Sequence, residues 1–366
     1  MRRCRKPRRL VLRTRRRIIP FQAQPLRPMN DKLPLNRQAT DYIDPLPAPH
    51  DWARLTAAPA KPMLFATDIY FRECWAEAVG SWSTDTAGVA RRLGLLIFKP
   101  DAIVGRRVER AVEFMNRHGF RVVHASVVHL NRYVSAELWR YNWNFATVDR
   151  IRLSTLLYDA CDTLALIVAN SDPAADHAPV PVSVRLSELK GSASKPNGDG
   201  TRMRELLGMP NRLLNFVHIA DEPADIIREL GIVFDAAERQ AVLDGIAQAL
   251  DGSAEVDVAT HASHLYETVR EHDLDFGRSL ERLVASGAMS PEAAVGMREA
   301  SGSRSLTWPE LARTIALDEH NRWDFLTVGT TLLCDEREGH ADLLPGTVAT
   351  DWIRGDLSGP NAGRAR

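Results

Sequence analysis

Cysteine is scarce in this sequence, and the four that occur stand far apart. Cys4, Cys74, Cys161 and Cys334 form no CxxC pair, which argues against a zinc knuckle and against a disulfide framework. This usage is typical of a reducing compartment, so we expect a cytoplasmic protein.

Long apolar runs are missing as well. GLLIF at 94–98 is about the strongest short run, whereas a membrane helix needs about 20 apolar residues. At 366 residues with 45% apolar content, the chain is long enough for two or three domains with a real core. We therefore expect a soluble protein without a membrane partner.

Acidic residues are absent from the first 17 residues, which carry ten Lys or Arg. Since the whole chain is neutral, the remainder carries about ten negative charges. Such an arm can bind nucleic acid or an anionic surface, and it shares its arginine content with transit peptides. An unpatterned charge run cannot bury enough apolar area to fold. We therefore favour a disordered tail, or an upstream extension with the working start at Met29.

A proline-rich sequence with little apolar periodicity follows the basic arm. We predict that residues 1–62 form a basic, proline-rich, disordered segment. Residues 63–92 are predicted to be a helical lead-in, because DIYFRECWAEAV at 68–79 repeats its apolar residues at helical spacing.

Strand and helix patterns alternate from residue 93. Four apolar runs predict strands: LGLLIFKPD from 93, FRVVHASVVHL at 120–130, DTLALIVAN at 162–170 and LLNFVHI at 213–219. Between the first two, one helix is predicted from its apolar face, with Gly119 as its stop. That face consists of Val104, Val108, Ala111, Val112 and Met115.

Further helices are predicted near 134–142, 150–158 and 184–189, and after the last strand. The order β-α-β-α-α-β-loop-β-α predicts an α+β fold, a ferredoxin-like α/β sandwich with a four-stranded antiparallel sheet. A mostly helical domain is predicted over 236–350, followed by a tail at 351–366. Within about 305–350, EHNRW paired with a later HADLLP resembles the RyR-type domain of bacterial multidomain proteins, which implies ligand sensing.

Several polar side chains of the 93–235 segment suit phosphate chemistry. They are Lys99, Arg185, Ser192, Ser194, Arg204, Asn215 and His218. They stand in LIFKPD, SVRLSEL, SASKPNGDGTRMRE and NFVHIAD, with NRHGFRVV at the joint before the second strand. In these motifs and their order, residues 93–235 resemble the nucleoside diphosphate kinase family.

The resemblance implies a phosphotransferase in which His218 is the nucleophile. His218 would attack the γ-phosphate of a nucleoside triphosphate, hold it as phosphohistidine and pass it to a diphosphate. Lys99 would bind a phosphate oxygen and a ribose hydroxyl, and Arg204 and Arg185 would clamp the phosphates. Magnesium would arrive with the nucleotide, with Asp221 touching its water shell.

The remaining implied nucleotide contacts come from three polar side chains. Ser192, with Ser194 as a substitute, would take the place of the family's threonine on phosphate. Asn215 would hydrogen-bond the ribose 3′-hydroxyl, and Tyr141 would match the family's phosphate-side tyrosine.

Glu229 follows His218 by eleven residues, on a predicted helix that starts at Asp221 and Pro223. Glu229 lies at the edge of the apolar stripe, so its carboxylate can accept a hydrogen bond from one N–H of the His218 ring. This bond would fix the tautomer of the ring and leave the other ring nitrogen free to attack. The family has a glutamate at this offset.

Two residues depart from the family pattern: Ile219 replaces a glycine and Ala220 a serine. They favour an alternative hypothesis, a catalytically silent nucleotide-binding module in a sensor or regulatory protein. A third hypothesis is a scaffold that binds nucleic acid through the basic arm. The protein could also form a homo-oligomer, a question that the sequence leaves open.

Overall fold

One four-stranded sheet lies at the centre of the fold. The structure is a computed structural model, which describes residues 45–82, 85–193, 199–252 and 256–357. The strands are β1 (Leu93–Phe98), β2 (Phe120–Val128), β3 (Thr163–Asn170) and β4 (Val217–Ile219), in the order β2-β3-β1-β4. Neighbouring strands all pair antiparallel. The predicted α+β, ferredoxin-like fold with a helical C-terminal region is confirmed.

Every residue of β1 and β3 is buried, as expected for central strands covered on both faces. Successive side chains point to opposite faces, so Leu96 and Phe98 enter one apolar cluster and Leu95 and Ile97 enter another. We name these the first and second cluster.

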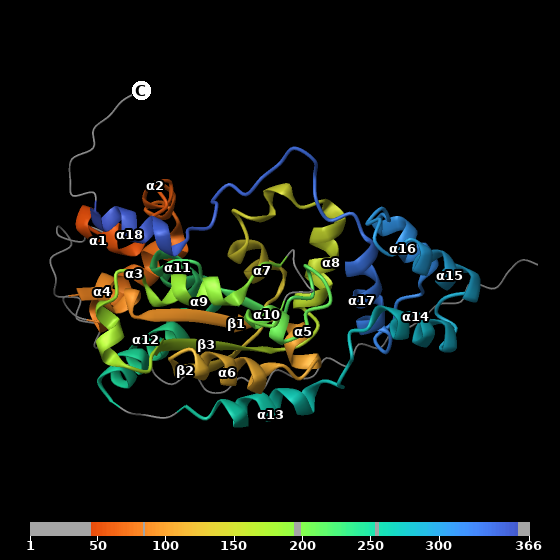
Figure 1. Ribbon diagram of the computed structural model, residues 1–366, viewed down its shortest axis with the longest axis horizontal. Coiled ribbons are helices and arrows are strands. Elements are labelled where there is room, and N and C mark those ends of the chain that lie inside the picture. Colours follow the sequence, from red (N-terminus) through yellow and green to blue (C-terminus); the bar gives the residue numbers. More distant parts are fainter. Residues whose placement is uncertain (1–44, 83–84, 194–198, 253–255, 358–366) are drawn as a thin grey trace, which may run out of the picture. The chain divides into compact units, whose positions relative to one another are not determined.

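Helices cover both faces of the sheet (Figure 1). Residues of one group pack in the first cluster: α5 (Pro100–Val104), α6 (Val108–Arg117), α8 (Val148–Tyr158), α9 (Val182–Lys190), α10 (Met203–Leu206), α13 (Val258–Thr268), α14 (Phe276–Ala285), α15 (Pro291–Glu299), α16 (Trp308–Thr314) and α17 (Arg322–Leu332). Residues of the other group pack in the second cluster: α1 (Pro49–Leu55), α2 (Lys61–Phe65), α3 (Ile69–Ser81), α4 (Thr86–Arg91), α7 (Arg132–Leu138), α11 (Pro223–Val233) and α12 (Ala236–Asp251).

The lead-in folds earlier in the chain than predicted. Residues 45–62, which we assigned to the disordered segment, include α1 and the start of α2. The predicted helix at 68–79 is present as α3. Residues 1–44, which contain the basic arm and Met29, lie outside the described residues.

A buried ion cluster explains why the lead-in is ordered. Lys61 Nζ lies 2.7 Å from Glu222 Oε2 and also bonds Asp225, and Glu222 accepts a further bond of 2.7 Å from Ala57 N. The Lys61 and Glu222 side chains are almost completely buried. Since a buried charge is tolerated only when it is paired, this cluster holds the lead-in to the start of α11. Glu222, rather than the predicted Asp221, is the N-cap of α11.

The helix predicted after the first strand is two helices. The chain leaves α5 at Gly105, and Arg106 adopts a positive φ of 56°, so Val104 belongs to α5 and not to the apolar face of α6. Gly119, with φ of 81°, follows the end of α6 as predicted.

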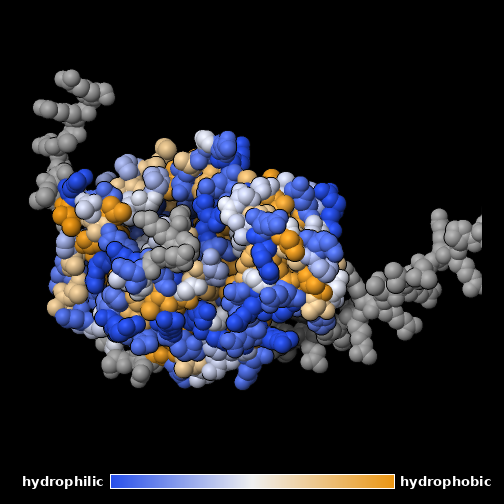
Figure 2. Space-filling model, turned by 45° about the vertical axis from the view of Figure 1, so that its right-hand side comes forward, coloured by the Kyte–Doolittle hydropathy of each residue, from blue (hydrophilic) through white to orange (hydrophobic). Residues whose placement is uncertain are grey.

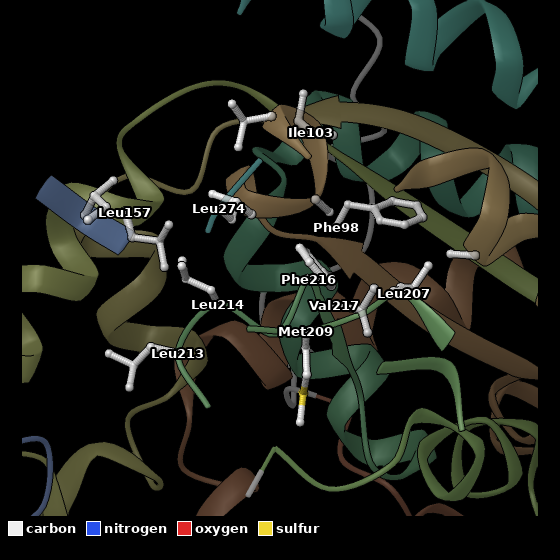
Figure 3. Close-up of a cluster of buried hydrophobic side chains, with 14 of the residues drawn as sticks. Phe98, Ile103, Leu157, Leu207, Met209, Leu213, Leu214, Phe216, Val217 and Leu274 are labelled. Carbon is white, nitrogen blue, oxygen red and sulfur yellow. The ribbon is translucent and has the colours of Figure 1, made fainter. Parts of the chain in front are cut away.

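The last strand is shorter than predicted, because the chain turns sharply at Phe216. Its φ is 67°, and Val217 N donates to Asn215 O at 2.8 Å across it. The buried Asp101 holds this turn by accepting Phe216 N–H at 2.8 Å. Phe216 itself packs in the first cluster beside Val217, Phe98 and Leu207 (Figure 3).

The C-terminal helices share the core of the sheet. α12 packs against β2, and α13 packs against α5, α6 and β2, so the predicted boundary at 235/236 does not separate two cores. Helices α14 to α17 group at one end of the sheet, and the chain then crosses back to α18 (Ala349–Leu357) (Figure 1).

On the face drawn in Figure 2, hydrophilic residues are interspersed with smaller hydrophobic areas. In the described part of the chain, no helix has the length and apolar character needed to cross a membrane.

Gly231 marks a close approach of α11 to α3. A Cβ at this position would lie 2.2 Å from the carbonyl oxygen of Tyr70. We predict that Gly231→Ala lowers the free energy of unfolding by about 1–3 kcal/mol, since a packed backbone cannot move freely. The matched control is Gly296→Ala in α15, where nothing lies within 4 Å and alanine should stabilise by up to about 1 kcal/mol. Urea denaturation measures both; equal effects would contradict the prediction.

Candidate functional site

A cavity of about 300 Å³ opens where β1 ends and β4 begins. We name it the His218 cavity. Most of its polar lining comes from ten side chains: Lys99, Asn142, Arg150, Ser154, Lys190, Arg204, Arg212, Asn215, His218 and Asp221, with Asp342 from the C-terminal part of the chain. Leu157, Leu213 and Val217 join it to the first cluster (Figure 3).

His218 lies in β4, with its ring facing α7 and α11. Its Nε2 lies 2.9 Å from both carboxylate oxygens of Glu229, which is buried in α11. The edge of the ring meets Trp139, at 5.3 Å between ring centroids. A carboxylate at Nε2 accepts a proton there, so Nδ1 carries the lone pair of the neutral ring. The histidine and glutamate singled out in the sequence are thus brought together.

Lys99 follows β1 and is buried. Its Nζ donates to Asn215 Oδ1 at 2.8 Å and to the carbonyl of Leu213. Burial lowers the pKa of Lys99 to about 8, although Asp101, 3.8 Å away, opposes this shift. Asn215 donates in turn to Arg212 O at 2.7 Å, so Asn215 positions the lysine.

Arg204 and Lys190 lie along the backbone of β4 on either side of His218. Arg204 Nη2 donates to Val217 O at 2.8 Å, and Lys190 Nζ lies 3.5 Å from Ile219 O. Burial lowers the pKa of Arg204 to about 10 and also lowers that of Lys190. Both are cations held at a desolvation cost, which an anion in the cavity would offset.

Asp221 balances part of this charge. Its Oδ1 accepts from Ser187 at 2.8 Å and lies 3.4 Å from Lys190 Nζ. Burial alone would raise the pKa of Asp221, but the charges of Lys190 and Lys61 hold it well below its usual range. Asp221 therefore stays ionised at the wall of the cavity.

Sequence reasoning missed Arg150 and Arg212, which add two further cations. The Arg150 guanidinium lies 5.1 Å from the centre of the Phe145 ring, and its Nε and Nη1 are buried without a hydrogen-bond partner among the described residues. Burial lowers the pKa of Arg150. Arg212 pairs with Asp335 and Glu336. Nothing in the helical pattern around VDRIRLSTLLY marks Arg150 as different from a solvated arginine.

An aromatic wall faces these cations, and the sequence analysis missed it too. Tyr158 stacks on Trp139 with ring centroids 4.6 Å apart, and Trp139 stacks on Trp143 at 5.6 Å. All three line the cavity. Flat apolar rings beside a set of cations suit a ligand with a planar group and an anionic group.

Three predicted contact residues lie elsewhere. Arg185 donates to Asn170 at 2.8 Å and stacks on Phe120, at the end of the sheet opposite to Lys99, because Ala169 pairs with Leu93. Arg185 therefore does not line the His218 cavity, whereas Lys190, five residues later in α9, does.

Tyr141 packs against Phe65 and the guanidinium of Arg228 and is not part of the cavity lining. Ser192 is exposed and does not line the cavity, although the next residue, Ala193, does. Ser194 lies outside the described residues.

Comparisons with known proteins identify a distant structural similarity. No protein-family model matches the chain, and no curated protein is similar to it in sequence. Among solved structures, the chain is similar to a nucleoside diphosphate kinase from Aquifex aeolicus, determined in an orthorhombic crystal form. The match covers 40% of this chain and 97% of that chain, with 15% sequence identity and a TM-score of 0.32. At this distance the similarity carries no functional argument, so the chemistry rests on the cavity's own residues.

The lowered pKa of Lys99 predicts a pH dependence of anion binding. Below about 8 the ammonium form predominates and attracts an anion; above it the neutral amine does not. We expect the affinity for pyrophosphate to fall as pH rises from 8 to 9.5, by at most about tenfold per pH unit.

The control is Lys99→Gln, which should bind more weakly with a flatter pH profile. Titration calorimetry of both proteins from pH 7 to 9.5 measures the difference. An identical pH slope in the two proteins would show that Lys99 is not the group responsible. The free energy of unfolding of the ligand-free protein should change in the opposite direction. As pH rises from 8 toward 10.5, wild type should become more stable relative to Lys99→Gln, because the buried Lys99 loses its charge.

Proposed function

We propose that the protein is a nucleoside diphosphate kinase-like phosphotransferase that works through a phosphohistidine at His218. The observation that carries this proposal is the contact of 2.9 Å between His218 Nε2 and the buried Glu229, in a cavity lined by five Lys or Arg side chains. An imidazole held in one tautomer is a nucleophile, and cations around it stabilise a phosphoryl group.

In the first half-reaction, Nδ1 of His218 attacks the γ-phosphorus of a nucleoside triphosphate. The bond from that phosphorus to the bridging oxygen breaks, and a nucleoside diphosphate leaves with the electron pair. Glu229 stabilises the positive charge that the ring acquires. In the second half-reaction, a terminal oxygen of an acceptor diphosphate attacks the phosphorus and restores the free histidine.

The other lining residues supply charge and shape. Lys99, Arg204 and Lys190 would contact phosphate oxygens near His218, and Arg150 would reach an oxygen farther along the cavity. We assign to Asn215 the positioning of Lys99. The aromatic wall would contact the nucleoside.

Magnesium fits this site as an ion carried by the nucleotide. No group of three or more His, Cys, Asp or Glu in the described part of the chain is placed to hold a metal, and Asp221 already bonds Ser187 and Lys190. Magnesium is commonly held by substrate phosphates and water with one or two carboxylates. When bound, it would neutralise phosphate charge; Asp221 would touch its water shell.

The side chain of Ile219 leaves β4 on the face opposite to that of His218, although Ile219 also lines the cavity. His218 pairs with Ile97 and Ile219 pairs with Leu96, so their side chains leave β4 toward opposite faces. Ile219 packs in the first cluster, whereas His218 faces Glu229 and Trp139. This arrangement supports an active site over the alternative, a catalytically silent nucleotide-binding module in a sensor or regulatory protein.

Phosphate transfer to the protein tests the proposal. Incubation with magnesium and γ-labelled ATP should place acid-labile label on wild type, and His218→Asn should remove it. The matched control is His129→Asn, an exposed histidine that bonds Asp159 and Asp162 and should not affect labelling. Glu229→Gln should slow labelling by roughly 10²- to 10⁴-fold, the usual range for a group that orients or activates a nucleophile.

If the wild-type protein binds ATP without becoming labelled, the proposed transferase activity is wrong and the catalytically silent nucleotide-binding module is favoured. Label that persists in His218→Asn would overturn the assignment of the nucleophile. A chase of the labelled protein with different diphosphates identifies the acceptor.

A further inference from the structure

A C-terminal segment forms one side of the His218 cavity. Residues 334–348, between α17 and α18, run alongside residues 141–147 (Figure 1). We name this segment the strap. Arg337 N donates to Phe145 O at 2.7 Å, and Leu343 N donates to Tyr141 O at 3.0 Å. Leu344 is buried in the second cluster. Backbone bonds on both sides of Asp342 thus fix its position.

Asp342 is the strap's contribution to the cavity lining. Asn142 Nδ2 lies 3.4 Å from its Oδ1, and no cation of the described residues lies within ion-pair distance of it. Two other carboxylates of the strap, Asp335 and Glu336, pair with Arg212. Asp342 is exposed at the cavity's mouth, so its oxygens are available to hydrogen-bond donors of a ligand.

An aromatic residue, Trp143, stands in the segment that the strap contacts. Trp143 lines the cavity between Asn142, which bonds Asp342, and Asn144, which donates to Ala341 O. The cations near His218, which are Lys99, Arg204 and Lys190, come instead from the end of β1, from α10 and from α9. A carboxylate repels phosphate, so the two parts of the cavity suit different parts of one ligand: phosphates near His218, and a planar, N–H-bearing group near Trp143.

We propose that Asp342 selects guanine nucleotides by accepting two hydrogen bonds from the base while Trp143 contacts its face. This inference rests on the proposed function, since it identifies the nucleotide that the site takes. A carboxylate has two parallel acceptor oxygens and no donor. Guanine presents two adjacent donors, N1–H and the 2-amino group. Adenine and cytosine place an acceptor beside their donor, and uracil flanks its donor with two acceptors, which would face the carboxylate unfavourably.

Equilibrium binding of diphosphates to the full chain tests the base preference. We expect GDP to bind about ten- to a hundredfold more tightly than IDP, which lacks only the 2-amino group, because a bond to a charged acceptor is lost. ADP should bind no more tightly than IDP. Asp342→Asn should abolish the preference for GDP over IDP; IDP should bind more weakly as well, since its N1–H also loses a charged acceptor, but by less than GDP. The matched control is Glu338→Gln, an exposed strap residue outside the cavity lining, which should keep the preference. Thermal melting confirms that both variants fold.

Phosphohistidine labelling, run in parallel, separates the two proposals. Equal affinity for GDP and IDP, or a preference that survives Asp342→Asn, overturns the role of Asp342 even if His218 becomes labelled. A preference for GDP that depends on Asp342, without labelling, supports the base selection and overturns the transferase. The absence of binding of any diphosphate at millimolar concentration overturns both.

Discussion

The turn at Phe216 is the constraint on which the cavity depends. A phenylalanine at a positive φ of 67° costs of order 1–3 kcal/mol and persists only where surrounding contacts determine it. Here the ring is buried in the first cluster, and Asp101 accepts the backbone N–H. Without this turn, residues 213–219 would continue as one strand and point alternate side chains to opposite faces. The turn instead ends the strand before Val217, and Asn215, ahead of it, lines the cavity together with Val217 and His218 of β4.

The second requirement is the position of α11, because Glu229 reaches His218 from this helix. Lys61 pairs with Glu222 at its start, and Arg228 pairs with Asp68 at 2.8 Å and donates to Glu137 O at 3.0 Å farther along. These partners lie in the lead-in, α3 and α7. Removing one member of a buried pair costs about 3–5 kcal/mol, because the other charge is left unpaired. The lead-in is thus part of the scaffold that holds Glu229 against His218.

Charge is distributed unevenly in a chain that is neutral overall. Five Lys or Arg side chains line one cavity, where Asp221 and Asp342 are the acidic residues, and burial lowers the pKa of Lys99, Arg204, Lys190 and Arg150. Holding these groups together costs solvation and repulsion in the free protein, and a bound anion relieves both. The strap adds the exposed carboxylate of Asp342 to the lining, so the cavity carries both positive and negative side chains.

The sequence by itself predicted the four strands, most of the flanking helices and the contact of His218 with Glu229, because these depend on local apolar periodicity and on residues close in the chain. It also identified Lys99, Arg204 and Asn215, which stand at element ends that the fold brings together. Only the tertiary structure decided that Arg185 and Tyr141 lie elsewhere, that Lys190, Arg150 and Trp143 line the cavity, and that Asp342 closes it from more than 120 residues downstream of His218. Periodicity tells which face of a helix is apolar. It does not tell which polar residue faces a cavity rather than water, because that depends on packing between segments distant in the chain.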